Sequence, residues 1–198
     1  MPSDILQVIF KEAINKSFNM VSIDTDTSTS DTVAIIANGL AGKVDIIQFK
    51  EALIKMSIDL AKEIARDGEG ATKLVEVTVN ESSSFSQAKK IAKSIVNSPL
   101  VKTAIFGRDP NWGRIAMAIG KCEDELDLNP ENISIYFGET LIYKGKPIDS
   151  DNLTLIQNYL ENSDIKIKVS LGLGNQEATV WGCDLSYDYV KINGSYTT

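Results

Sequence analysis

The 198-residue sequence contains no histidine and only two cysteines, Cys122 and Cys183. The missing histidine excludes Ser-His-Asp and Cys-His nucleophile pairs, histidine-ligated zinc and every histidine general base. Two thiols are too few for a disulfide-stapled fold, and they are interpreted as small apolar residues rather than reactive groups. An enzyme built from this chain must therefore use a carboxylate, a lysine, a terminal amine or a group on another chain as its base.

Long apolar runs and an excess of positive charge are also missing. The run Val33–Ile36 is far too short to span a bilayer, and Met1–Asp4 lacks the basic start and apolar stretch of a signal peptide. There are 27 acidic and 20 basic residues, the net charge is −7, and the lysines are scattered along the chain. This charge is unfavourable for binding phosphate backbones. We therefore expect a cytoplasmic protein that binds neither membranes nor nucleic acids.

Hydrophobic spacing predicts an interleaved order of helices and strands. Asp45 with Gln48, and Ser84 with Gln87, are spaced as helix-starting pairs, and Gly68 stands where a helix-ending glycine belongs. The predicted helices cover Ile5–Ile14, Asp45–Gly68, Ser84 to just before Pro99, Trp112–Gly120 and Leu153–Leu160. The predicted strands before the last helix cover Val75–Val79, Val101–Phe106, Ile133–Phe137 and Thr140–Tyr143.

The C-terminal quarter predicts a β-hairpin. Apolar and polar residues alternate over Ile165–Leu173, Gly174–Glu177 forms a turn, and alternation resumes over Trp181–Tyr189. Hairpins make part of the sheet antiparallel, so the fold class is mixed α/β: a layered sandwich with a mixed, partly antiparallel sheet covered by helices. A chain of this length buries roughly 70% of its unfolded surface, which predicts one domain over 1–198 or two closely packed lobes, about 1–100 and 101–198.

Four ordered segments resemble one known family. They are Ser17–Asn19 with Asp24–Asp31, Arg66–Lys73, Val101–Ala104 with Asp109–Arg114, and Trp181–Leu185 with Tyr187–Asn193. Together they resemble the β chain of the ornithine acetyltransferases, the glutamate N-acetyltransferases of the arginine pathway. In the first segment Thr25 and Ser30 stand where the family usually has Gly and Asn. The fold that the resemblance implies is ornithine acetyltransferase-like.

The resemblance implies an acyltransferase without a cofactor. The family is made as a precursor that cleaves itself at an Ala-Thr bond, and the freed threonine accepts an acetyl group from N-acetylornithine and passes it to glutamate. Acetyl-CoA is a second donor to consider, because no feature of the sequence separates monofunctional from bifunctional members. An N-terminal threonine carries its own base, an α-amino group with a pKa of about 8, and has no need of histidine.

The resemblance also implies a partner chain. Met1–Leu6 aligns beyond the family's Thr-Met-Leu start, so we expect no catalytic nucleophile in this chain. The oxyanion-hole Thr-Gly pair and the active-site lysine of the family lie on an α chain cut from the same precursor. An assembly of two α and two β chains is therefore expected.

Three residues are predicted to bind substrate. Glu69 lies between two glycines in a segment that joins a helix to a strand, where side chains reach a cleft more easily than a core. The family counterpart of Glu69 contacts the amino-acid substrate, and a carboxylate suits an amino group. Asn193 and Thr198 match two substrate-binding positions of the family near the C-terminus, and an amide and a hydroxyl can hydrogen-bond a carboxylate or an amide.

Two other polar segments are weighed against structural roles. Asp109–Arg114 is interpreted either as an anion site at a helix start or as a turn in which Trp112 packs. Asp24, Asp26 and Asp31 are spaced like metal ligands, but the glycine and closing glutamate of a calcium loop are missing. We expect an ordinary polar loop there and no metal site.

Two alternative functions keep the same architecture. The β-aminopeptidases also use a self-generated N-terminal nucleophile, although Gly68–Gly70 and Asp109–Arg114 favour the acetyltransferases. A non-catalytic structural or binding subunit is the second alternative, because the expected threonine is missing from the sequence.

Overall fold

The structure is a computed structural model that describes residues 1–122, 127–148 and 151–195. Its helices are α1 (Ser3–Lys16), the short 3₁₀ helix η1 (Phe18–Met20), α2 (Ile46–Arg66), α3 (Phe85–Val96), α4 (Pro99–Phe106), α5 (Trp112–Gly120), α6 (Asp151–Tyr159) and α7 (Tyr187–Ser195). Its strands are β1 (Leu74–Ser82), β2 (Ser134–Phe137), β3 (Thr140–Lys144), β4 (Asp164–Ser170) and β5 (Gln176–Cys183). None of the helices in these ranges has the length and apolar character needed to cross a membrane.

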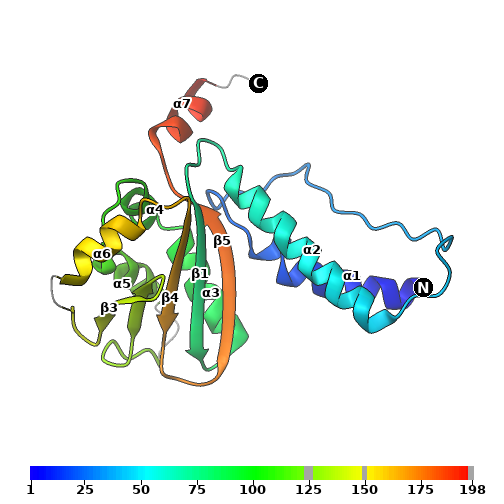
Figure 1. The fold of residues 1–198 in the computed structure, drawn as a ribbon, viewed down its shortest axis with the longest axis horizontal. Helices are drawn as coiled ribbons and strands as arrows, with labels where there is room; N and C mark the ends of the chain where they lie inside the picture. Colours follow the sequence, from blue (N-terminus) through cyan, green and yellow to red (C-terminus); the bar gives the residue numbers. More distant parts are fainter. Residues whose placement is uncertain (123–126, 149–150, 196–198) are drawn as a thin grey trace.

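The strands form one mixed sheet in the order β3-β2-β4-β1-β5. β1 runs parallel to β4 and antiparallel to β5, and the other neighbours are antiparallel. α1 and α2 extend from one side of the sheet, and α7 rises from the end at which β5 finishes (Figure 1). The predicted class, a layered α/β fold with a partly antiparallel sheet, is confirmed.

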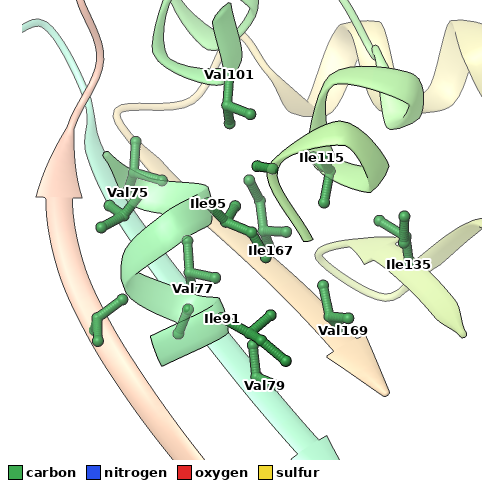
Figure 2. Close-up of a cluster of buried hydrophobic side chains, with 14 of the residues drawn as sticks. Val75, Val77, Val79, Ile91, Ile95, Val101, Ile115, Ile135, Ile167 and Val169 are labelled. Carbon is green, nitrogen blue, oxygen red and sulfur yellow. The ribbon is translucent and has the colours of Figure 1, made fainter. Parts of the chain in front are cut away.

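The core lies between the sheet and the helices that cover one of its faces. Val75, Val77 and Val79 alternate with polar residues on β1 and are almost completely buried. Ile91 and Ile95 of α3 lie across them (Figure 2). The strict alternation of β4 follows the same rule, because its other face exposes lysines. A smaller cluster of Ile9, Ala13 and Leu53 forms where α1 contacts α2.

The predicted hairpin near the C-terminus is wrong. Its two strands exist as β4 and β5, but β1 lies between them and pairs with both. The segment Leu171–Gly174 crosses the end of β1 and donates backbone hydrogen bonds to Asn80 and Glu81. Alternation determines which side chains face the core but not which strand is the neighbour. The second strand also ends at Cys183, and the residues from Tyr187 onward form α7.

The predicted strand Val101–Phe106 is also wrong, because these residues lie in α4. Pro99 occupies the first turn of that helix, where its missing N–H costs nothing. A short apolar run can be a buried strand or a buried helix, and Val101, Ala104 and Ile105 are indeed buried at helical spacing. The other predicted helices and strands are confirmed, and Asp45 and Ser84 accept N-capping hydrogen bonds as expected.

α2 is joined to the second face of the sheet by a charged contact. Glu76 on β1 accepts hydrogen bonds from the Lys62 ammonium at 2.8 Å and the Trp181 indole N–H at 2.9 Å. The Lys62 ammonium also lies 5.6 Å from the centre of the Trp181 ring. Burial raises the pKa of Glu76, but the bonds from Lys62 and Trp181 outweigh it and hold the pKa below its ordinary value.

We predict that Glu76→Gln lowers the free energy of unfolding by about 2 kcal/mol at pH 7. A lowered folded-state pKa stabilises the fold above the unfolded-state pKa of about 4.3, and this contribution is lost as the pH falls through the folded value. The difference from wild type should therefore shrink in urea unfolding at pH 3.5. Glu63→Gln, at an exposed position of α2, is the control and should change stability little at either pH. An equal loss at both pH values for Glu76→Gln would contradict the assignment.

Candidate functional site

The segment that joins α2 to β1 packs closely against the end of β5 and the start of α7. A Cβ atom on Gly68 would lie 2.9 Å from the Cys183 sulfur. Gly70 adopts φ +67°, and a Cβ there would lie 2.7 Å from the Asp188 carbonyl carbon. The two glycines that flank Glu69 are therefore required for close approach, and Gly70 also for its left-handed backbone. The turn Gly68–Lys73 is held against the C-terminal elements.

A buried carboxylate fixes this turn from the sheet side. Asp184, only 2% exposed, follows β5 directly. Its carboxylate accepts hydrogen bonds from the backbone N–H groups of Thr72 at 2.8 Å and Lys73 at 2.9 Å, and from the Thr72 hydroxyl at 2.5 Å. The sequence analysis did not single out Asp184. An acidic residue at the end of an apolar strand, inside a matched segment, was the available signal.

Two of the three predicted substrate-binding residues meet at the turn. The side-chain amide of Asn193 donates to the Glu69 carboxylate at 2.6 Å, and to the carbonyl of Tyr189 at 3.0 Å. Both Glu69 and Asn193 are exposed. Thr198, the third predicted residue, lies outside the described residues. The roles of all three in substrate binding stay predictions, but Glu69 and Asn193, distant in sequence, are direct neighbours.

The polar loop near the N-terminus reaches the same place. The Tyr189 hydroxyl of α7 donates to the Asp24 carboxylate at 3.0 Å. Burial raises the pKa of Tyr189, and the bond to Asp24 raises it further, so the phenol keeps its proton. Asp24 also accepts from the backbone N–H of Asp26. Within the described part of the chain no group of three or more acidic or thiol side chains is placed to hold a metal ion.

Lys102 contacts Ile23 and Cys183, the two residues that pack most closely on Gly68. Its ammonium donates to the Ile23 carbonyl and lies 3.7 Å from the Cys183 sulfur. Burial raises the pKa of the Cys183 thiol, although Lys102 opposes this shift. A thiol that keeps its proton is a poor nucleophile. The arrangement therefore gives Cys183 a packing role beside Gly68.

The Asp109–Arg114 segment builds the junction between α4 and α5. Asn111 accepts the N-capping hydrogen bond from the Arg114 backbone. The Arg114 guanidinium donates to the Leu100 carbonyl at 2.8 Å and the Thr103 hydroxyl at 3.2 Å. Trp112 stacks on the Tyr143 ring with 4.8 Å between the ring centres. These contacts favour the turn interpretation over the anion site, because the guanidinium is already used within the fold.

Thr25 gives a prediction about the Asp24 loop. Its φ is 82°, a left-handed conformation that is costly for a β-branched residue. This is the position at which the ornithine acetyltransferases usually have glycine. Thr25→Gly should therefore raise the free energy of unfolding by about 1 kcal/mol. Thr27, whose backbone is outside this region, is the matched control, and Thr27→Gly should lower stability. Urea denaturation checks both, and a loss of stability in Thr25→Gly would show that the strain is absent.

Known proteins are similar to this sequence along its whole length. A sequence model of the ArgJ family matches residues 1–198. The protein named "Arginine biosynthesis bifunctional protein ArgJ 2" from Nostoc sp. is 54% identical, in a match that covers 99% of this chain and 50% of that protein. The protein named "Glutamate N-acetyltransferase" from Methanosarcina acetivorans is 44% identical, with 100% of this chain and 52% of that protein covered. The chain thus spans about half the length of these curated relatives.

The fold matches a solved structure of the same kind. The crystal structure of arginine biosynthesis bifunctional protein argJ from Bacillus halodurans has a TM-score of 0.93 and 43% sequence identity, with 99% of this chain and 95% of that chain covered. The resemblance drawn from the four sequence segments is confirmed by these relatives. The chain belongs to the ArgJ family.

Proposed function

We propose that the chain is one half of a glutamate N-acetyltransferase that moves an acetyl group from N-acetylornithine to glutamate. The contact between Glu69 and Asn193 supports this most directly, because it joins two residues that the family resemblance assigns to substrate binding. The names of the relatives, arginine biosynthesis bifunctional protein and glutamate N-acetyltransferase, agree with it. Acetyl-CoA as an additional donor belongs to the same proposal.

The proposed chemistry has two half-reactions, as the resemblance implies. A threonine hydroxyl oxygen, outside this chain, attacks the acetyl carbon of N-acetylornithine, the C–N bond breaks, and ornithine leaves with the proton on its amine. The glutamate amine then attacks the acetyl ester, the ester C–O bond breaks, and a proton returns to the threonine oxygen. The threonine α-amino group serves as the base, so the missing histidine is no obstacle.

The residues of this chain bind and orient the substrate in this scheme. The Glu69 carboxylate accepts a hydrogen bond from the amino group of the amino-acid substrate. The two N–H groups of the Asn193 amide bond Glu69 and Tyr189 in the structure, and on substrate binding one of them exchanges this partner for the substrate carboxylate. Both groups are exposed, so a substrate can reach them without displacing packed side chains. Thr198 is proposed to add a hydroxyl near the C-terminus.

We predict that Glu69→Gln in the complete enzyme lowers kcat/KM for N-acetylornithine by about 10- to 150-fold. The loss corresponds to one hydrogen bond to a charged group, about 1.5–3 kcal/mol. Glu177→Gln is the matched control, since Glu177 is an exposed glutamate at the start of β5, whereas the turn of Glu69 lies beside the end of that strand. Its kinetics should be unchanged. Steady-state rates that fall less than threefold in Glu69→Gln would exclude the role.

We further propose that the other half of the protein covers an apolar face of α2. One side of α2 packs on α1 and the sheet, through Leu53, Ala61 and Ala65. A second stripe is exposed at helical spacing: Met56 is 53% exposed, and Leu60 and Ile64 are each 50% exposed. An amphipathic helix needs only one apolar stripe, so a second one favours a partner. The relatives are about twice as long as this chain, which makes their other half the natural occupant. An α2β2 assembly is part of this proposal.

The purified 198-residue chain should transfer no acetyl group from N-acetylornithine to glutamate, and co-expression with the other half should restore transfer. The physical reason is that no group in this chain is expected to hold the acetyl group between the two half-reactions. In the co-expressed protein, Leu60→Glu should reduce co-purification of the two halves, because it places a charge in the apolar stripe. Leu155→Glu, at a residue of α6 that is 59% exposed, should not. Measurable transfer by the isolated chain would overturn the assignment of the nucleophile.

We also propose a cytoplasmic location. Cys122 and Cys183 are both buried as reduced thiols rather than joined in a disulfide. This state is typical of a reducing compartment. The location itself stays a prediction.

A further inference from the structure

α7 carries Asn193 but has almost no apolar anchor. None of its residues is buried, and Val190 is 67% exposed. Tyr187 is 85% exposed, and its one ring contact is edge-to-face with Phe106 of α4, with 5.5 Å between the ring centres. The helix rises away from the sheet (Figure 1). Most helices are oriented by burying an apolar face. The position of Asn193 relative to Glu69 therefore depends on the Phe106–Tyr187 ring contact and on a few polar contacts at the start of α7.

Ser186 makes two of these contacts with one hydroxyl. It immediately precedes α7 and is only 6% exposed. Its Oγ donates to the Gly70 carbonyl at 2.5 Å and accepts from the Asp188 backbone N–H at 3.1 Å. The first bond reaches the turn next to Glu69, and the second caps the helix that carries Asn193. The Ser186 side chain thus joins the turn that carries Glu69 to the helix that carries Asn193, the two predicted substrate-binding residues.

The turn Gly68–Lys73, which Ser186 contacts through the Gly70 carbonyl, is also fixed by other residues. Asp184, two residues earlier, fixes the backbone of Thr72 and Lys73 through its buried carboxylate. Gly70, which has no side chain, lets the backbone of α7 approach closely. Contacts at Gly70 and at Thr72–Lys73 therefore fix the part of the turn that follows Glu69. The Asn193–Glu69 hydrogen bond closes the ring at the far end of α7.

We propose that Ser186 is a positioning residue that holds α7 against the Glu69 turn and thereby sets the spacing between Glu69 and Asn193. Its effect on catalysis rests on the proposed function, whereas its effect on α7 does not. Loss of the hydroxyl leaves Glu69 and Asn193 chemically intact but lets α7 change direction. The substrate then has to order the site on binding, which raises KM more than it lowers kcat.

The test uses three variants of the complete enzyme. Ser186→Ala and Ser186→Gly both remove the two hydrogen bonds of the hydroxyl, but glycine is tolerated at a helix start far better than alanine. Ser94→Ala is the matched control, because the Ser94 hydroxyl donates a comparable 2.6 Å bond to the Ala118 carbonyl, from α3 to α5. Hydrogen exchange over 187–195 reports on α7, and steady-state kinetics report on the substrate.

In both Ser186 variants the α7 amides should exchange about tenfold faster, and the amides of β1 and β5 should exchange at the wild-type rate. KM for the amino-acid substrate should rise about tenfold, and kcat should stay within about threefold of the wild-type value. In the Ser186→Ala background, Glu69→Gln should lower kcat/KM by a smaller factor than it does in the wild type, because the two residues act together. Ser94→Ala should show none of these effects. Wild-type α7 exchange and KM in Ser186→Gly would overturn the proposal. If α7 exchange rises but neither Ser186→Ala nor Glu69→Gln affects kinetics, Ser186 does hold α7 against the Glu69 turn, and the proposed function is wrong.

Discussion

The position of β1 between β4 and β5 governs the geometry of this chain. Because β1 is parallel to one neighbour and antiparallel to the other, its first residue, Leu74, pairs with both Asp164 and Cys183. At one end of the sheet, therefore, β1 and β4 begin and β5 finishes. Every chain segment that enters or leaves there is brought into the same small volume. The turn of Glu69 leads into β1, and α7 follows β5, so the two are neighbours as a result of the pairing.

The buried carboxylate of Asp184 stabilises that end of the sheet. Asp184 would be costly to bury alone, since an unpaired carboxylate loses its hydration. The Thr72 and Lys73 backbone groups and the Thr72 hydroxyl offset this cost, and in return they lose their own freedom to move. Lys73 adds a second anchor, because its ammonium donates to the carbonyls of Leu160 and Asn162 just before β4. The end of the Glu69 turn that leads into β1 is therefore fixed to buried structure.

The two sides of the candidate site differ in how they are held. Glu69 projects from a turn fixed by buried hydrogen bonds, whereas Asn193 lies on a helix that is held by Ser186, Tyr189 and its own bond to Glu69. Elements with few buried contacts open at low free-energy cost. α2 is likewise only partly covered, because it buries one apolar stripe within the fold and leaves the other exposed.

The sequence by itself determined the local structure and the family. Helical and alternating periodicities located α1, α2, α3, α5, α6 and the strands, because burial on one face is encoded by residues three, four or two apart. The matched segments also selected Glu69 and Asn193 as predicted substrate-binding residues, and the glycines that flank Glu69 indicated unusual backbone angles and close approach. These signals are short-range, so they can be recognised without knowing the partners.

Only the tertiary structure decided which distant segments are neighbours. Strict alternation in β4 and β5 is compatible with a hairpin, yet β1, about 90 residues earlier than its partner β4, inserts between them, because pairing depends on the whole sheet. The apolar run of α4 was ambiguous for the same reason. Asp184 and Ser186 are ordinary polar residues in the sequence. They became recognisable only when the fold placed their oxygens against the backbone of Gly70, Thr72 and Lys73, since a hydrogen bond between residues more than 100 positions apart leaves no local pattern.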